Sequence, residues 1–153
     1  ILNNQMDDFS LAPGVPNAFG LVGAEANRVE PGKRPLSSMS PTIVMQGEKP
    51  ILTLGAAGGP KIISQVVLTI LRVIDRNMTL REAVAASRFH HQWRPDQLFV
   101  ERRFKQWSFP EKVLEDLQRR GHTLTPLDYT GATQCVGYST DGKLIGIAEP
   151  RLP

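Results

Sequence analysis

Residues 42–76 read TIVMQGEKPILTLGAAGGPKIISQVVLTILRVIDR, and this stretch contains the signals that decide the fold. Two apolar runs, 42–45 and 51–54, flank a loop that contains glycine, which is typical of a β-hairpin. From residue 61 to 76 apolar side chains recur at three- and four-residue spacing, which predicts an amphipathic helix. Its stripe comprises Ile63, Val66, Val67, Ile70 and Ile74. A hairpin should therefore lead through a Gly-Gly-Pro turn directly into a helix.

Downstream of this stretch the sequence predicts two more helices. One runs from about residue 80 to 88, and Thr79 with Glu82 forms a capping box at its start. The other runs from about 110 to 120. Ser108 and Glu111 stand at capping-box spacing before it, and Gly121 is suited to a left-handed residue after its end.

Further strands are expected at 98–101, 124–129, 133–138 and 144–147, the last two joined by a type I′ turn at Asp141-Gly142. Strands come in hairpins, and the helices form a block between them. This order favours an α+β fold in which an antiparallel sheet is flanked by helices.

Composition limits the class of protein. The length of 153 residues fits a single domain. The net charge of +3 comes from basic residues scattered among acids, which gives no support to a nucleic-acid role. A single cysteine, Cys135, rules out an internal disulfide, and no apolar run is long enough to span a membrane.

The first 41 residues are rich in proline, glycine and polar side chains. Residues 11–34 form a long loop, which is either a lid over a site or a mobile surface loop. Phe19 would cap a pocket in the first case and anchor the loop in the second. Residues 35–42, PLSSMSPT, place hydroxyls between two prolines, as in a stiff ligand-binding segment or a turn that starts a strand.

Three runs together resemble gamma-glutamyltranspeptidase, an N-terminal nucleophile hydrolase. They are NNQMDDFS at 3–10, PLSSMSPT at 35–42 and GAAGGP at 55–60. The resemblance continues through 13–17, 86–92 and 149–151. It implies a four-layer αββα sandwich, of which residues 1–153 would be one domain, the C-terminal portion of the small catalytic subunit. It also implies that another chain covers the sheet edge left by missing strands.

The resemblance implies an enzyme that cleaves gamma-glutamyl amides such as glutathione and transfers the acyl group to water or amino acids. It implies autoprocessing that exposes an N-terminal threonine nucleophile, no cofactor, and a periplasmic or extracellular location. That threonine lies upstream of the run at 3–10, so we expect this chain alone to be inactive. Its expected partners are the large subunit, or an upstream segment of the same precursor, and a small gamma-glutamyl substrate. The alternatives are a truncated, non-catalytic homologue that acts as a binding or structural fragment, and a related acylase.

The resemblance also assigns a substrate clamp. Asp8 would hold the α-amino group of the gamma-glutamyl substrate, with Gln5 beside it. Ser37 and Ser38 would bind its α-carboxylate, together with an arginine from another chain or segment. From the residues alone, an Asx-turn is the favoured interpretation of the run around Asp8.

Gly58 and Gly59 would form the oxyanion hole through their backbone amides, again by resemblance. Glycine allows a close approach to the backbone, and a helix N-terminus adds a partial positive charge. A tight connection without a ligand is the alternative. The family usually has a serine where Ala56 stands, which bears on the geometry of this loop.

The sequence predicts no metal site. Asp7 and Asp8 lack a third carboxylate at ligand spacing. His90 and His91 are adjacent in an extended segment and should point to opposite sides, which favours a structural role for them.

Overall fold

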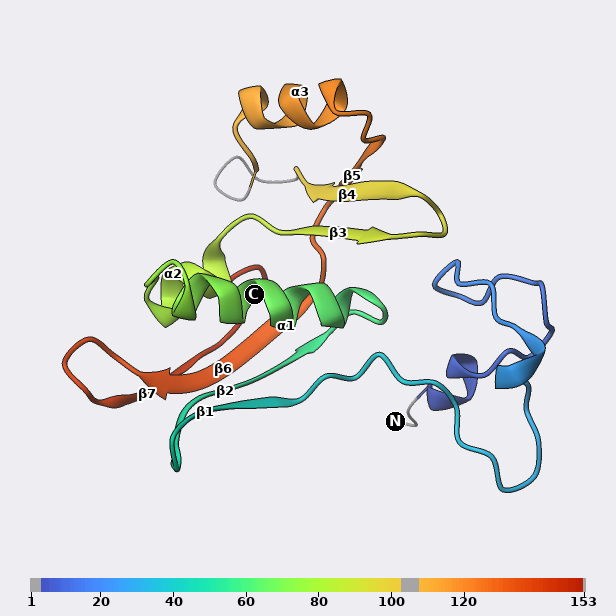
Figure 1. Cartoon of the computed structure of the whole chain (residues 1–153), viewed down its shortest axis with the longest axis horizontal. Helices are drawn as coiled ribbons and strands as arrows, with labels where there is room; N and C mark the ends of the chain where they lie inside the picture. The colour runs from blue at the N-terminus through green and yellow to red at the C-terminus, as the bar shows by residue number, and fades with distance from the viewer. Residues whose placement is uncertain (1–3, 103–107, 153) are drawn as a thin grey trace.

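The computed structural model describes residues 4–102 and 108–152, which form two β-sheets and three α-helices (Figure 1). The larger sheet has the order β1-β2-β6-β7, and all its pairs are antiparallel. Its strands are β1 (Thr42–Gln46), β2 (Lys49–Ala57), β6 (Ala132–Tyr138) and β7 (Leu144–Ile147). The helices are α1 (Lys61–Ile74), α2 (Leu80–Ala85) and α3 (Glu111–Arg119).

Helices α1 and α2 cover one face of the larger sheet (Figure 1). The alternation of β6 turns Thr133 and Cys135 toward this face, and burial raises the pKa of the Cys135 thiol. The core between helices and sheet consists of apolar residues from α1, α2 and three strands: Leu52, Leu54, Ile62, Val66, Leu80, Val84, Cys135 and Ile147. The predicted hairpin and the helix that follows it are confirmed as the centre of the fold.

Apolar side chains also lie on surfaces that the described chain leaves open. On the outer face of the sheet, Ile43 is 62% exposed and Met45 is 50% exposed. Helix α1 buries Ile62, Gln65, Val66 and Thr69 and leaves Ile63 half exposed. The predicted stripe is therefore only partly the buried face, because α1 is apolar on two sides and the sheet covers one of them.

The smaller sheet comprises β3 (Phe89–Gln92), β4 (Gln97–Glu101) and β5 (Leu124–Leu127), in that order. β3 and β4 are antiparallel, whereas β4 and β5 are parallel, so the expectation of purely antiparallel pairing is wrong for this pair. The reason is that α3 lies between β4 and β5 in sequence and works as a crossover, which returns the chain in the same direction. Leu114 of α3 packs on β4 and closes a second, smaller core.

The ends of the helices and the turn before β7 test the capping and turn signals that the sequence contains. The Thr79/Glu82 capping box is present, and Gly121 is left-handed with φ 93°. Helix α3, however, has Pro110 at its N-cap without a side-chain cap, so Ser108 is not the residue that caps it. The turn before β7 has a positive φ only at Gly142, so it is not type I′, in which both central residues have positive φ.

Two short 3-10 helices, η1 (Gln5–Asp8) and η2 (Glu25–Asn27), interrupt the long N-terminal segment. This segment lies beside the end of α1 where the glycine turn enters it (Figure 1). No helix in the described ranges has the length and apolar character needed to cross a bilayer.

Candidate functional site

The turn between β2 and α1 is a left-handed glycine corner. Gly58 has φ 145° and Gly59 has φ 59°, conformations that side chains rarely adopt. The first N–H groups of α1 donate to the two glycine carbonyls, Lys61 to Gly58 at 3.3 Å and Ile62 to Gly59 at 3.0 Å. Within the described residues, the N–H groups of Gly58 and Gly59 donate to no protein acceptor, so the turn itself does not use them.

Close packing also requires each of these two residues to be glycine. A Cβ at Gly58 would lie 2.8 Å from the carbonyl oxygen of Thr130, and one at Gly59 would lie 2.7 Å from the ring of Phe19. The backbone of the loop after β5 thus packs directly on Gly58, and the aromatic ring from the N-terminal segment covers Gly59.

A cavity of about 540 Å³ lies between this corner and the N-terminal segment. Asp7 and Asp8 line one side of it, and Ser37 and Ser38 line another. In the described part of the chain, the Asp8 carboxylate has no hydrogen-bonding partner, and Asp7 Oδ2 is buried without one. The cavity can therefore bind a small molecule that offers an ammonium group to carboxylates and an acceptor to hydroxyls. Phe19 and Pro60 also form part of its wall.

The hydroxyl groups of Ser37 and Ser38 differ in whether their protons are already used in a hydrogen bond. Ser38 Oγ donates to the carbonyl oxygen of Gly59 at 3.0 Å, so it holds the glycine corner against the cavity. Ser37 Oγ accepts from the N–H of Met39 at 3.2 Å, which leaves its own proton free to donate. Ser37 is thus ready to bind an acceptor, whereas Ser38 would have to exchange its bond to Gly59.

Two asparagines fix the walls of the cavity. Asn27 Nδ2 donates to the carbonyl oxygen of Asp8 at 2.7 Å, and its Oδ1 accepts from the N–H of Leu36 at 3.0 Å. Asn27 thus joins the segment of Asp8 to the segment of the serines. Asn17 Oδ1 accepts from the N–H groups of Phe19 and Leu21, both at 3.0 Å, and its Nδ2 donates to the Asp7 carbonyl oxygen at 3.2 Å.

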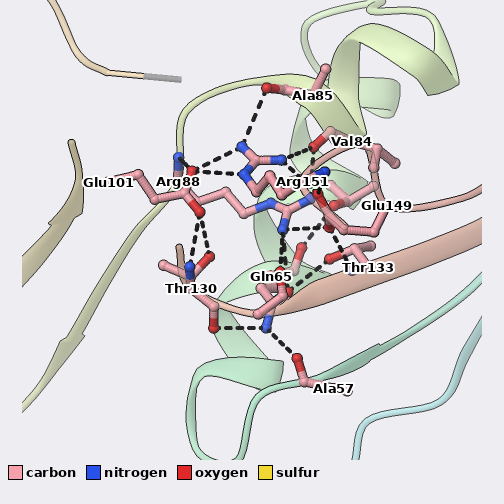
Figure 2. Close-up of polar contacts among 12 residues, drawn as sticks. Ala57, Gln65, Val84, Ala85, Arg88, Glu101, Thr130, Thr133, Glu149 and Arg151 are labelled. Carbon is pink, nitrogen blue, oxygen red and sulfur yellow. Dashed lines mark hydrogen bonds and ion pairs between the residues drawn. The ribbon is translucent and has the colours of Figure 1, made fainter. Parts of the chain in front are cut away.

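Behind the glycine corner lies a buried polar network, shown in Figure 2. Arg88 pairs with Glu149 at 2.8 Å, and Arg151 pairs with Glu101 at 2.8 Å and with Glu149 at 2.9 Å. All four side chains are at most 1% exposed. Glu101 also accepts from the N–H of Thr130 at 2.9 Å, so the ion pairs reach the loop that packs on Gly58.

Gln65 connects this network to the corner itself. Its Nε2 donates to the carbonyl oxygens of Ala57 at 3.2 Å and Thr130 at 3.4 Å, and its Oε1 accepts from Arg88 at 3.3 Å (Figure 2). Ala57 is the last residue of β2, directly before Gly58. The corner is therefore held from behind by a buried amide and from the cavity side by Ser38.

Burial and charge act on the network in opposite directions. Burial lowers the pKa of the Arg88 guanidinium and the Arg151 charge lowers it further, whereas the charges of Glu149 and Glu101 raise it. Burial raises the pKa of Glu149, but the N–H of Thr133 and the two arginines outweigh it and hold the pKa of this carboxyl below its usual range. Glu149 is thus a buried anion that balances two buried cations.

The structure brings together most of the residues that the sequence proposed. Asp8, Phe19, Ser37 and Ser38 line one cavity, and Gly59 adjoins it through contacts with Phe19 and Ser38. Gly58 lies one residue behind, and Gln5 lies in η1 outside the cavity lining. The described residues contain no group of three or more His, Cys, Asp and Glu side chains placed to hold a metal ion.

Comparison with known families and structures gives a consistent result. The family model for gamma-glutamyltranspeptidase matches residues 1–153. The glutathione hydrolase proenzyme of Escherichia coli (strain K12) is 47% identical over 151 residues, which cover 99% of this chain and 25% of that protein. The chain thus spans about a quarter of the length of such relatives.

Solved structures share the fold. A mutant of gamma-glutamyltranspeptidase from Helicobacter pylori is 44% identical, with a TM-score of 0.89, and the match covers 99% of this chain and 81% of that chain. A cephalosporin acylase from Bacillus halodurans is 27% identical, with a TM-score of 0.70, over 82% of this chain and 23% of that chain. The α+β architecture is that of the N-terminal nucleophile hydrolases.

The pKa of Glu149 predicts how stability should depend on pH. A carboxyl whose pKa is lower in the folded state stabilises the fold above its ordinary pKa, and this contribution is lost as the pH falls through the folded value. Glu149→Gln should lower the free energy of unfolding at pH 7 by about 3–5 kcal/mol, because it leaves the buried Arg88 without its counter-ion, whereas Arg151 keeps Glu101. The deficit should shrink in acid. Urea unfolding of the 153-residue chain at pH 7 and below pH 4.5 measures both, with exposed Glu48→Gln as the control. An equal deficit at both pH values would contradict this assignment.

The hydrogen bonds of Asn17 and Asn27 predict that their loss will affect different backbone amides. Asn27→Ala should speed hydrogen exchange of the Leu36 amide, and Asn17→Ala that of the Phe19 and Leu21 amides, because each amide loses its acceptor. Asn17→Ala loses three hydrogen bonds and Asn27→Ala loses two, and each loss should lower the free energy of unfolding by about 1–3 kcal/mol in total. The variants control for each other. If both speed the same amides, the two side chains do not hold separate walls.

Proposed function

The chain belongs to the gamma-glutamyltranspeptidase family, and from that premise we propose that it supplies the substrate clamp and oxyanion hole of an enzyme that transfers gamma-glutamyl groups. The activity acts on gamma-glutamyl amides such as glutathione, the substrate in the name of the E. coli relative. The acceptor is water or an amino acid. The observation that carries the proposal is the cavity that Asp8 lines together with Ser37 and Ser38, beside the glycine corner to which Ser38 is hydrogen-bonded.

The chemistry of the cavity fits an amino-acid headgroup. Asp8, with Gln5 nearby in η1, provides negative charge and an amide for the α-ammonium group. Ser37 offers a free hydroxyl proton to the α-carboxylate, with Ser38 beside it. The gamma-carbonyl group then extends toward Gly59, whose carbonyl Ser38 fixes. Phe19, packed on Gly59, closes the cavity, so the 11–34 loop acts as a lid.

The reaction proceeds by covalent catalysis. A threonine hydroxyl attacks the gamma-carbonyl carbon, and its proton passes through the threonine amine to the leaving nitrogen as the C–N bond breaks. The oxyanion that forms in between accepts hydrogen bonds from the Gly58 and Gly59 amides. Water or an amino acid then cleaves the ester and restores the hydroxyl. The chain spans about a quarter of the E. coli relative, and we propose that the threonine, and an arginine for the carboxylate, lie in the remaining part of such a protein.

The same remaining part provides the missing layers of the sandwich. The outer face of the larger sheet presents Ile43 and Met45, and the second sheet of an αββα sandwich would cover them. We therefore treat residues 1–153 as one domain of the small subunit, which docks on the large subunit or an upstream segment.

A chimera tests the function and the role of Asp8. In it, this chain replaces the matching quarter of the E. coli proenzyme. It should hydrolyse gamma-glutamyl anilide. Asp8→Ala should then lower kcat/KM for this substrate roughly ten- to a hundredfold more than for glutaryl anilide, which lacks only the α-amino group. Asp7→Ala is the matched neighbour. A selective loss with Asp7→Ala instead would assign binding of the α-amino group to Asp7. An unsubstituted chimera that prefers glutaryl anilide would indicate an acylase.

A second experiment tests the oxyanion hole. Gly59→Val in the chimera should lower kcat by about 10² or more and change KM less, because the oxyanion exists only in the transition state. Valine would also displace Phe19, because its Cβ would lie 2.7 Å from the ring. Phe19→Ala alone, and the double variant, separate these effects. Recovery of kcat in the double variant would show that the clash, and not the amide, limits turnover.

A further inference from the structure

A second cavity, of about 450 Å³, adjoins the first across a shared wall of Pro16, Phe19, Val22 and Pro60. Its charged side chains are Lys61, at the start of α1, and Arg94, and no carboxylate of the described residues lines it. The first cavity carries Asp7 and Asp8 instead. Two cavities of opposite charge therefore meet at the glycine corner.

The far wall of the second cavity is fixed by a chain of hydrogen bonds. Gln92 Nε2 donates to the carbonyl oxygen of Arg94 at 2.6 Å, which orients the amide so that its Oε1 faces His90 Nε2 at 2.8 Å. His90 Nε2 must then carry the proton. Nδ1 accepts from the Ser64 hydroxyl at 2.7 Å. This wall is neutral and has its donors and acceptors satisfied, so the charge of the cavity comes from Lys61 and Arg94.

Lys61 is the cation best placed for a ligand. The residue is partly exposed and lines the cavity, and its ammonium group has no carboxylate partner within the described ranges. Burial lowers the pKa of His90, the hydrogen bond with Gln92 raises it, and the Lys61 charge lowers it again, which fits a cation close to this wall. Arg94 is exposed and lies over the ring of Trp93, with 4.4 Å between the guanidinium carbon and the ring centroid. A cation that lines a cavity and has no counter-ion there favours an anionic ligand.

We propose that this second cavity binds the carboxylate of the amine half of the substrate, that is, of the amino acid or peptide joined to the gamma-glutamyl group. The proposal rests on the proposed function for the position of the acyl bond at the glycine corner. The gamma-glutamyl headgroup occupies the cavity with the carboxylates, and the amine half passes Phe19 into the cavity with Lys61. The enzyme would therefore select amines that bear a carboxylate over neutral amines.

Binding to the 153-residue chain gives the first test, and it is independent of catalysis. N-acetylglycine carries the carboxylate, and N-acetylglycinamide is the same molecule without the charge. In an NMR titration, N-acetylglycine should shift the signals of the Lys61 side chain and the His90 ring, and N-acetylglycinamide should not. Lys61→Met should abolish the shifts, and Lys61→Arg should retain them. Equal shifts with both probes, or none with either, would overturn the proposal.

Kinetics of the chimera give the second test. Gamma-glutamylglycine and gamma-glutamylglycinamide differ only in the carboxylate. Lys61→Met should lower the preference for the first, measured as the ratio of kcat/KM values, by about five- to thirtyfold, between the effects of an exposed and a buried ion pair. Lys49→Met makes the same change in net charge at the other end of β2 and should leave the ratio unchanged. An equal loss on both substrates with Lys61→Met would overturn the proposal. A chimera without gamma-glutamyl activity would refute the proposed function, and the NMR result would still decide the anion site.

Discussion

The structure depends on four fully buried charges, those of Arg88, Glu101, Glu149 and Arg151. Such charges give little net stability when paired but cost several kcal/mol when one partner is removed. Here these charged groups also fix the positions of neighbouring segments through hydrogen bonds. Arg88 donates to the carbonyl oxygen of Val84 at 2.6 Å, and Arg151 donates to that of Ala86 at 2.9 Å, so carbonyl groups at the end of α2 are satisfied by one arginine four residues further on and one from the C-terminal segment. The arrangement joins both sheets, both core helices and the C-terminal segment.

Local signals in the sequence predicted what lies close together along the chain. The hairpin, the glycine corner, α1 and the capping box of α2 each depend on residues within a few positions of one another, and each is confirmed. Asp8, Phe19 and the serine pair came from motifs, and the structure places them at one cavity. Their roles in catalysis remain proposals.

Long-range features escaped this kind of prediction. Glu101 and Arg151 are 50 positions apart and meet only in the fold, and a charged residue is expected at the surface unless its partner is known. The available signals were Glu101 itself, a carboxylate at the end of an apolar strand, and the family resemblance through 86–92 and 149–151, which contain Arg88, Glu149 and Arg151. Asn17 and Asn27 appeared as ordinary loop residues, because nothing in the sequence shows which distant carbonyl an amide will bind. The parallel pairing of β4 and β5 was missed for a similar reason, since strand direction is set by the crossover through α3.

The wall of Phe19 and Pro60 separates two binding environments that differ in charge. An acyl bond held at this wall has its amino-acid headgroup on one side and its amine half on the other. Selectivity for each half would then be set by different residues, Asp8 for the first and Lys61 for the second, and could change independently.

The close packing around Gly58 also limits how this corner can vary. A methyl group at Gly131 would lie 2.2 Å from the carbonyl oxygen of Ala57, so neither Gly58 nor Gly131 accepts even alanine without separating two segments of backbone. Gly55, three residues earlier in β2, is different, because a Cβ there meets nothing within 4 Å in the described structure. Gly55 faces the same side of β2 as Thr53, which is the outer face that the second sheet of the sandwich would cover. A side chain at Gly55 would therefore leave the turn intact and would instead meet the partner that packs on this face, whereas one at Gly58 or Gly131 would disrupt the corner itself.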